Sequence, residues 1–168
     1  MDVEAAVRSL IDRQQIVDTL LRYASSVDQK DYPTLRSTLT DDAVAQYGEG
    51  TDVIRGGDTI TAWIDQMTVA RGWQHHMLNV YHVDIEGDEA RCLTYHTSHQ
   101  ADADAPDTVH VIVARYRDVV RRVDGGWKIA DKRMELCWIE QRAFPQSVIS
   151  EQTVADQENA LARAEGGR

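Results

Sequence analysis

The N-terminal part of the chain has the hydrophobic period of helices. Between Val3 and Val27 the apolar residues recur at steps of three and four, which predicts one amphipathic helix ending near Asp28. The apolar stripe of this helix consists of Val7, Leu10, Val17, Leu20, Leu21 and Ala24. An Asp-Tyr-Pro sequence at residues 31–33 predicts the start of a short second helix, and Asp58 is a suitable N-cap for a third.

From residue 74 onward the hydrophobic period changes to two, which indicates β-strands. Strands are predicted over residues 43–47, 74–85, 89–100, 109–123 and 127–140, with tight turns at 86–88 and 124–126 and a polar loop at 101–107. Helices followed by a meander predict an α+β fold, in which one curved, mostly antiparallel sheet wraps around the N-terminal helices as a conical barrel. We expect one domain over residues 1–145 and a helical or flexible C-terminal tail over 146–168.

Composition and charge narrow the classes of partner. The 168 residues fit one domain, and 42% hydrophobic with 27% charged residues excludes disorder of the whole chain. The net charge of −10 repels phosphate backbones and anionic lipid, so we expect neither a nucleic-acid nor a membrane partner. The first residues carry acids where a signal peptide carries Lys or Arg, and we therefore expect a cytoplasmic protein. Cys92 and Cys137 are isolated, which favours neither a disulfide framework nor a zinc ribbon.

An acidic residue shares the apolar arc of the first helix. At that position the Asp28 carboxylate either caps the following turn or needs a buried partner. The predicted strands or their ends carry the histidines His75, His76, His82, His96, His99 and His110. A carboxylate that accepts the Nδ1 proton of an imidazole leaves Nε2 free as a base, so an Asp-His dyad is the sharper hypothesis. Only one of the neighbours His75 and His76 can face the interior of a regular strand.

Two tyrosines are suited to hold a carbonyl or a departing hydroxyl. Tyr23 lies one turn before Asp28 on the flank of the same stripe, and Tyr47 ends the first strand. The chain has no HxH, HExxH, GxSxG, P-loop or GxGxxG pattern. The sequence therefore supports neither a metal site nor a hydrolase elbow nor a nucleotide site, and we expect no cofactor.

The order of elements carries a family resemblance, together with the sequences SVDQKDY, DDAVAQY, QHHMLN, GDEA and VVRRVDGGWKIADKR. Over residues 5–140 the chain resembles the SnoaL-like branch of the nuclear transport factor two-like superfamily, which contains scytalone dehydratase, bile acid dehydratase, lindane dehydrochlorinase and ketosteroid isomerase. The resemblance implies a conical α+β barrel with a deep, mostly apolar pocket. In the dehydratases and the dehydrochlorinase, a helix-end Asp supports a strand His that is the base of an elimination.

By this resemblance Asp28 is the supporting carboxylate and His75 is the base, with His76 as its rival. Further catalytic candidates by the same resemblance are Tyr23, Tyr47 and His99. Candidates for contact with the substrate are His76, Trp63, Met77, Tyr95, Lys132 and Arg133. The general base of ketosteroid isomerase corresponds to Tyr47, and a tyrosine with its ordinary pKa near 10 does not replace it at neutral pH.

The leading hypothesis is a cofactor-free lyase that eliminates water from a cyclic, largely apolar small molecule. A polyketide cyclase or a ketosteroid-type isomerase would use the same pocket without loss of water. A third hypothesis is a binding or assembly module that only holds a ligand. An open sheet tends to bury its outer face, and Trp127, Trp138 and the Val-rich third long strand lead us to expect a homodimer or homotrimer.

Overall fold

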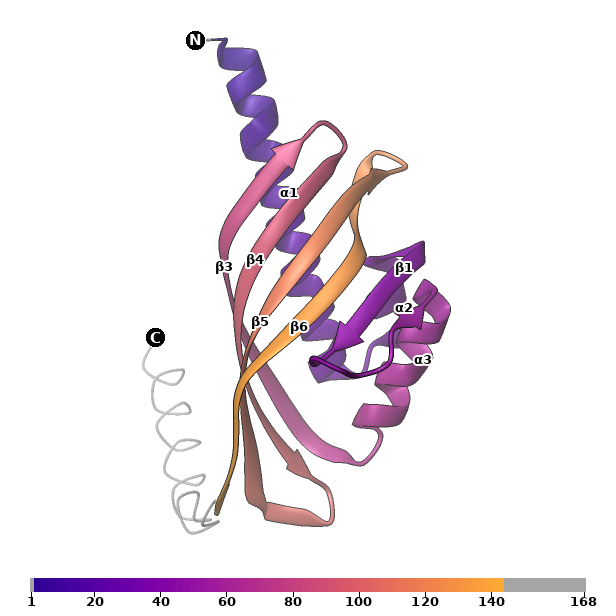
Figure 1. The fold of residues 1–168 in the computed structure, drawn as a ribbon, viewed down its shortest axis with the longest axis vertical. Helices are drawn as coiled ribbons and strands as arrows, with labels where there is room; N and C mark the ends of the chain where they lie inside the picture. The colour runs from indigo at the N-terminus through magenta and orange to yellow at the C-terminus, as the bar shows by residue number, and fades with distance from the viewer. Residues whose placement is uncertain (1, 144–168) are drawn as a thin grey trace, which may run out of the picture.

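The computed structural model describes residues 2–143, which form three helices and one six-stranded sheet (Figure 1). The helices are α1 (Val3–Gln29), α2 (Tyr32–Ser37) and α3 (Gly57–Thr68). The strands are β1 (Leu39–Tyr47), β2 (Ile54–Arg55), β3 (Arg71–Glu86), β4 (Glu89–Asp102), β5 (Ala105–Val123) and β6 (Gly126–Ala143). The tail that the sequence predicts over 146–168 lies outside the described residues.

The sheet has the order β2-β1-β6-β5-β4-β3, and all of its neighbours pair antiparallel except β1 and β6. The four long strands are twisted and curve along α1, while α3 lies beside β1 (Figure 1). This arrangement confirms the predicted α+β fold with one curved, mostly antiparallel sheet. In the part of the chain that the structure describes, no helix is long and apolar enough to cross a membrane.

Helix α1 is fixed at both ends by local capping. The Asp2 side chain accepts hydrogen bonds from two backbone N–H groups of the first turn, and Lys30 ends the helix in the left-handed conformation. Its buried residues are Ile16, Leu20, Tyr23, Ala24, Ser26 and Val27. The predicted stripe is therefore only partly correct, because the first turns of α1 extend beyond the sheet and leave Val7 and Leu10 exposed (Figure 1).

Two strand boundaries also differ from the predictions. The strand predicted over residues 43–47 starts earlier, because β1 begins at Leu39 and includes Asp41 and Asp42, whose carboxylates bind Arg36 and Arg121. Most of the predicted polar loop at 101–107 continues the strands, because β4 runs to Asp102 and β5 begins at Ala105. The pairing of β4 with β5 continues past a register shift after Ala101, which keeps these polar residues in the sheet despite their low strand propensity.

Alternation along β4 places polar residues inside the concave face of the sheet. Ala90, Cys92, Thr94, His96 and Ser98 alternate with more exposed residues, and all five are buried. Since β3 and β4 pair without a register shift between residues 74 and 80, the inward residues of the two strands lie side by side. The concave face consequently combines an apolar core with buried hydrogen-bonding groups.

Candidate active site

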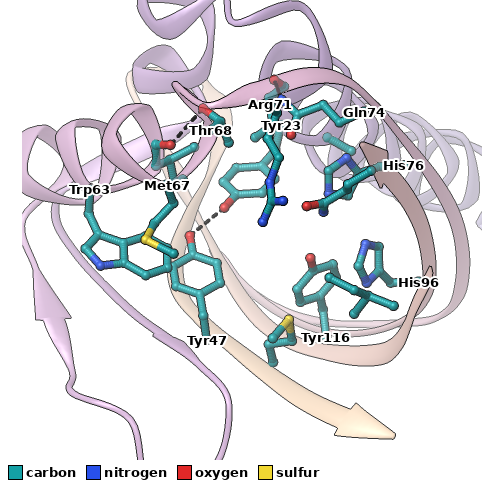
Figure 2. A pocket seen from close by; sticks show the side chains of 16 residues that line it. Tyr23, Tyr47, Trp63, Met67, Thr68, Arg71, Gln74, His76, His96 and Tyr116 are labelled. Atoms are coloured by element: carbon teal, nitrogen blue, oxygen red, sulfur yellow. Dashed lines mark hydrogen bonds between the residues drawn. The ribbon is translucent and has the colours of Figure 1, made fainter. Parts of the chain in front are cut away.

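A cavity of about 230 Å³ lies between the concave face of the sheet and the helices α1 and α3 (Figure 2). Its apolar lining includes Val27, Trp63, Ile64, Met67, Ile112 and Met134. Tyrosine, histidine, glutamine and arginine side chains from α1 and the strands complete the wall (Figure 2). A largely apolar cavity with a few convergent polar groups is the usual form of a small-molecule site.

His76 lines this cavity and forms an acid-base pair with Asp28, which lies outside the lining. The Asp28 Oδ1 atom contacts Nδ1 of the His76 ring, and Oδ2 accepts the backbone N–H of the same residue at 2.9 Å. A carboxylate in the last turn of a helix is disfavoured by the helix dipole, so these two donors compensate for its position. Because the carboxylate accepts from Nδ1–H, the neutral ring keeps Nε2 as its basic nitrogen.

The structure corrects the choice of histidine. His75, expected as the partner of Asp28, lies on the opposite, convex face of β3 and is exposed. Its neighbour His76 shares the inner face with Gln74 and Leu78, in the strand alternation that the sequence shows. The physical reason is that Asp28 at the end of α1 meets only the concave face of the sheet. The rival assignment is therefore the one that the geometry supports.

A second histidine, which the sequence reading did not select, lies beside the pair. The His96 ring stacks on His76 with centroids 5.0 Å apart and contacts the Tyr116 ring in a tilted arrangement with centroids 4.9 Å apart. Burial, together with the neighbouring His76 and Lys132, lowers the pKa of His96 to about 3. His96 is consequently neutral near pH 7, and neither of its buried ring nitrogens has a partner among the described residues.

Two tyrosine hydroxyls meet on the other side of the cavity. The Tyr23 and Tyr47 oxygens lie 2.5 Å apart, and the Tyr47 ring stacks on Trp63 with centroids 4.7 Å apart (Figure 2). Burial raises the pKa values of Tyr23, Tyr47 and Tyr116 above their ordinary value. All three phenols thus stay protonated. Since one hydroxyl of the Tyr23–Tyr47 pair donates to the other, the second keeps its proton for another acceptor.

Lys132 is buried behind the tyrosines and does not line the cavity. Its Nζ lies 3.2 Å from both carboxylate oxygens of Asp118, and 3.7 Å and 4.4 Å from the ring centroids of Tyr116 and Tyr23. Burial lowers the pKa of Lys132 and raises that of Asp118, while their mutual attraction opposes both shifts. Lys132, expected to contact the substrate, is separated from the cavity by aromatic rings.

The remaining candidates lie outside the cavity lining. Met77, Tyr95 and His99 are on the convex face, where His99 lies 6.5 Å from the ring centroid of His75. Arg133 pairs with Asp131 and also lies away from the cavity. Strand alternation turns Met77, Tyr95 and His99 outward, so the structure places none of these candidates in the lining of this cavity. The homodimer or homotrimer that the sequence leads us to expect stays a prediction.

Six wall residues with polar groups were missed from the sequence: Tyr116, Thr68, Arg71, Gln74, His96 and Gln100. The last three could have been found from the pairing register of the neighbouring strands. Once His76 is taken as inward, antiparallel pairing makes Gln74 and Gln100 direct neighbours and places His96 opposite Leu78. Tyr116 follows from the next pair of strands in the same way, since it lies opposite Thr94.

The described residues contain no cluster of three or more His, Cys, Asp or Glu side chains that could hold a metal ion. The nearest approach is the group of His76, His96 and Asp28, in which Asp28 is engaged by His76. The wall instead offers a basic nitrogen, protonated phenols and neutral amides. These groups are suited to transferring a proton and to holding an oxygen.

The chain is similar in sequence to a known domain family and in fold to many solved structures. The family profile described as "SnoaL-like domain" matches residues 8–133, whereas no curated protein matches the chain. A candidate scytalone dehydratase from Novosphingobium aromaticivorans has a TM-score of 0.73 at 17% identity, covering 82% of this chain and 95% of that one.

Two further structures have comparable similarity. The hexachlorocyclohexane dehydrochlorinase LinA type 3 from Novosphingobium barchaimii has a TM-score of 0.73 at 18% identity, covering 82% of this chain and 94% of that one. An NTF2-like protein with a cystatin-like fold from Novosphingobium aromaticivorans has a TM-score of 0.69 at 24% identity, covering 80% and 88%. These likenesses confirm the predicted fold, and at such identities they carry the fold alone.

Proposed function

The chain belongs to the SnoaL-like domain family, and on this premise we propose that it is a lyase that removes water from a cyclic, largely apolar small molecule. The observation that carries the proposal is His76 in the wall of a largely apolar cavity, with Asp28 bound to its Nδ1 from outside the lining. A supported imidazole facing such a cavity is the arrangement that general-base catalysis requires. The proposed reaction uses protein side chains only.

His76 is the proposed base. Its Nε2 takes a proton from a carbon next to the substrate carbonyl, and the electron pair of the broken C–H bond forms an enolate. The imidazolium that results is stabilised by Asp28, which also fixes the ring through Nδ1 and the backbone N–H. This support explains why a carboxylate is useful at the end of α1, where the helix dipole disfavours it.

The tyrosines are the proposed donors to the substrate oxygen. The free hydroxyl proton of the Tyr23–Tyr47 pair, or that of Tyr116, hydrogen bonds to the carbonyl oxygen as negative charge develops on it. Burial raises the pKa of each phenol, which keeps these protons in place near neutral pH. The apolar surroundings strengthen such hydrogen bonds because they exclude competing water.

Elimination completes the reaction. The enolate electron pair re-forms the carbonyl, the double bond forms between the α- and β-carbons, and the β C–O bond breaks. The departing hydroxide takes up the proton that His76 removed, so water leaves and the base is regenerated. The net reaction converts one substrate molecule to one enone and one water, without any oxidant or reductant.

The first step is testable without knowledge of the natural substrate. The protein is incubated with α-tetralone in D2O, and exchange of the α-protons is followed by NMR. His76→Gln and Asp28→Asn are each expected to slow the exchange by about a hundredfold or more. The neighbouring His75→Gln and the exposed Asp18→Asn are the matched controls, and both are expected to exchange at the wild-type rate.

Exchange that is unchanged in both His76→Gln and Asp28→Asn would rule out the dyad as the base. If His75→Gln alone lost activity, His75 on the convex face would be the base instead of His76. Elimination is then tested with β-hydroxy-α-tetralone, whose dehydration product tautomerises to a naphthol with a distinct absorbance. Proton exchange without release of water from this probe would instead favour the isomerase or cyclase reading.

A further inference from the structure

The amide of Gln74 is held so that its oxygen has no partner. The Gln74 side chain is 8% exposed and lines the cavity, and its Nε2 donates to the backbone carbonyl of Val27 at the end of α1. Because a carbonyl can only accept, this bond fixes which end of the amide is nitrogen. The oxygen Oε1 is buried, and no described residue donates to it.

An unpaired buried acceptor in a cavity wall is costly unless a ligand supplies the missing donor. Gln74 lies two residues before His76 on the same face of β3, which separates their Cα atoms by about 6.7 Å along the strand. A donor that reaches Gln74 is thus remote from a carbon that reaches His76. The separation corresponds to opposite sides of a small ring system.

A cation and a second amide lie at the same end of the cavity. Arg71 lines the cavity and forms an ion pair with Asp102, while Gln100 lies directly opposite Gln74 on β4. The Arg71 charge is therefore balanced by the Asp102 carboxylate. This balance favours a neutral group over an anion. A hydroxyl fits, since it donates to an amide oxygen and accepts from a guanidinium.

We infer that this end of the cavity, formed by Arg71, Gln74 and Gln100, binds a substrate hydroxyl that does not react, so that the substrate is a hydroxylated ring compound. The inference rests on the proposed function only in taking the bound molecule to be the substrate. It separates oxygenated ring substrates from halogenated hydrocarbons, which carry no hydrogen-bond donor. It also assigns Gln74 as a residue that determines specificity.

Equilibrium binding tests the inference without any turnover. Isothermal titration compares α-tetralone with analogues that carry one phenolic hydroxyl on the aromatic ring, and with their methyl ethers. At least one phenol is expected to bind about tenfold more tightly than α-tetralone, and its methyl ether is expected to lose the gain. Equal affinities of phenols and α-tetralone in the wild-type protein would overturn the inference. The inference would also be overturned if an analogue with a carboxylate in place of the phenolic hydroxyl bound more tightly than the phenol.

The variant Gln74→Met keeps the side-chain length and removes the acceptor. The ratio of phenol to α-tetralone affinity is expected to fall to about one, and the affinity for α-tetralone itself to change little. A purely structural effect would weaken both ligands equally and leave the ratio unchanged, which contradicts the assignment. Gln66→Met, at an exposed position of α3 outside the cavity lining, is the matched control, and loss of the ratio in this control would also contradict the assignment.

The two proposals fail separately. If α-proton exchange of α-tetralone is absent but the phenols bind more tightly through Gln74, the lyase proposal fails and the hydroxyl site stands as a ligand site. If exchange proceeds through His76 and the affinity ratio is one, the lyase proposal stands and the hydroxyl site is wrong. The exchange rate and the affinity ratio are measured independently on the same protein.

Discussion

Two acid-base pairs lie on the concave side of the sheet, and they differ in what encloses them. The side chains of His76 and Asp28 are 10% and 18% exposed, and the imidazole borders the cavity. The side chains of Lys132 and Asp118 are each 1% exposed, and tyrosine rings separate the lysine from the cavity. Both pairs join a carboxylate to a basic nitrogen, so their environment distinguishes their roles.

The difference shows how one sheet supports both chemistry and stability. A pair at a cavity can exchange a proton with a ligand, because the basic nitrogen has an open side. A pair that is fully enclosed contributes fixed charge and occupies volume, and breaking it leaves an uncompensated buried ion. The enclosed pair should therefore be more important for folding, and the pair at the cavity for activity.

The largest expected effect is on the enclosed pair. Lys132→Met leaves the Asp118 carboxylate buried without its cation, and we expect the free energy of unfolding to fall by about 3–5 kcal/mol. Urea denaturation followed by circular dichroism measures this loss. The double variant Lys132→Met with Asp118→Leu removes both charges and is expected to recover most of it. A single variant as stable as the wild type would remove the distinction between the pairs.

The pair at the cavity should respond in the opposite way. Asp28→Asn keeps the shape of the side chain and one of its two acceptor oxygens, so we expect the unfolding free energy to fall by only about 1 kcal/mol. The hundredfold loss of α-proton exchange proposed above corresponds to about 2.7 kcal/mol in the barrier. Urea denaturation and the exchange assay on the same preparation compare the two effects. An Asp28→Asn variant that unfolds as readily as Lys132→Met would give both pairs a structural role.

The fold could be predicted because periodicity records which face of each element is buried. The helical period before residue 72 and the period of two after it follow directly from burial against one sheet. Strand ends were less accurate, because polar residues such as Asp41 lie within β1, where its pairing with β6 is irregular between Leu39 and Val44. The first turns of α1 show the same limit, since their apolar residues extend beyond the strands.

The site was predicted in part, and the error has a specific cause. Asp28, Tyr23 and Tyr47 were found because a polar side chain on an apolar stripe, or at the end of a strand, is conspicuous. His75 was preferred over His76 on a family likeness, although His76 shares its face with Leu78. Alternation with apolar neighbours was the better guide, because it depends only on burial in this chain.

His96, which lies beside the pair at the cavity, should make the stability of the fold depend on pH. Its pKa is lowered to about 3 in the fold, whereas an unfolded chain has the ordinary value near 6.5. Between these values the unfolded state binds more protons, so stability is lost as pH falls below about 6.5 and levels off below 3. The loss from this group approaches about 1.4 kcal/mol per pH unit within that interval.

His96→Gln removes this titration, and its acid limb of stability is expected to be flatter than that of the wild type. Urea denaturation at pH 7, 6, 5 and 4 gives the two slopes. The exposed His75→Gln is the control and should retain the wild-type slope. Identical slopes in the wild type and His96→Gln would show that His96 gains its proton in the folded protein.

The smallest effect concerns a thiol beside the enclosed pair. Burial, with the Asp118 charge, raises the pKa of Cys92 to about 12, whereas Cys137 is exposed. A thiol is reactive as its thiolate, so a disulfide reagent at pH 8 should modify Cys137 quickly and Cys92 only on unfolding. The Cys137→Ser variant isolates Cys92, and absorbance of the released thiolate reports its rate. The structure around Lys132 must open before the reagent reaches Cys92. Rapid modification of Cys92 in this variant would therefore mean that the Lys132–Asp118 pair is accessible to solvent.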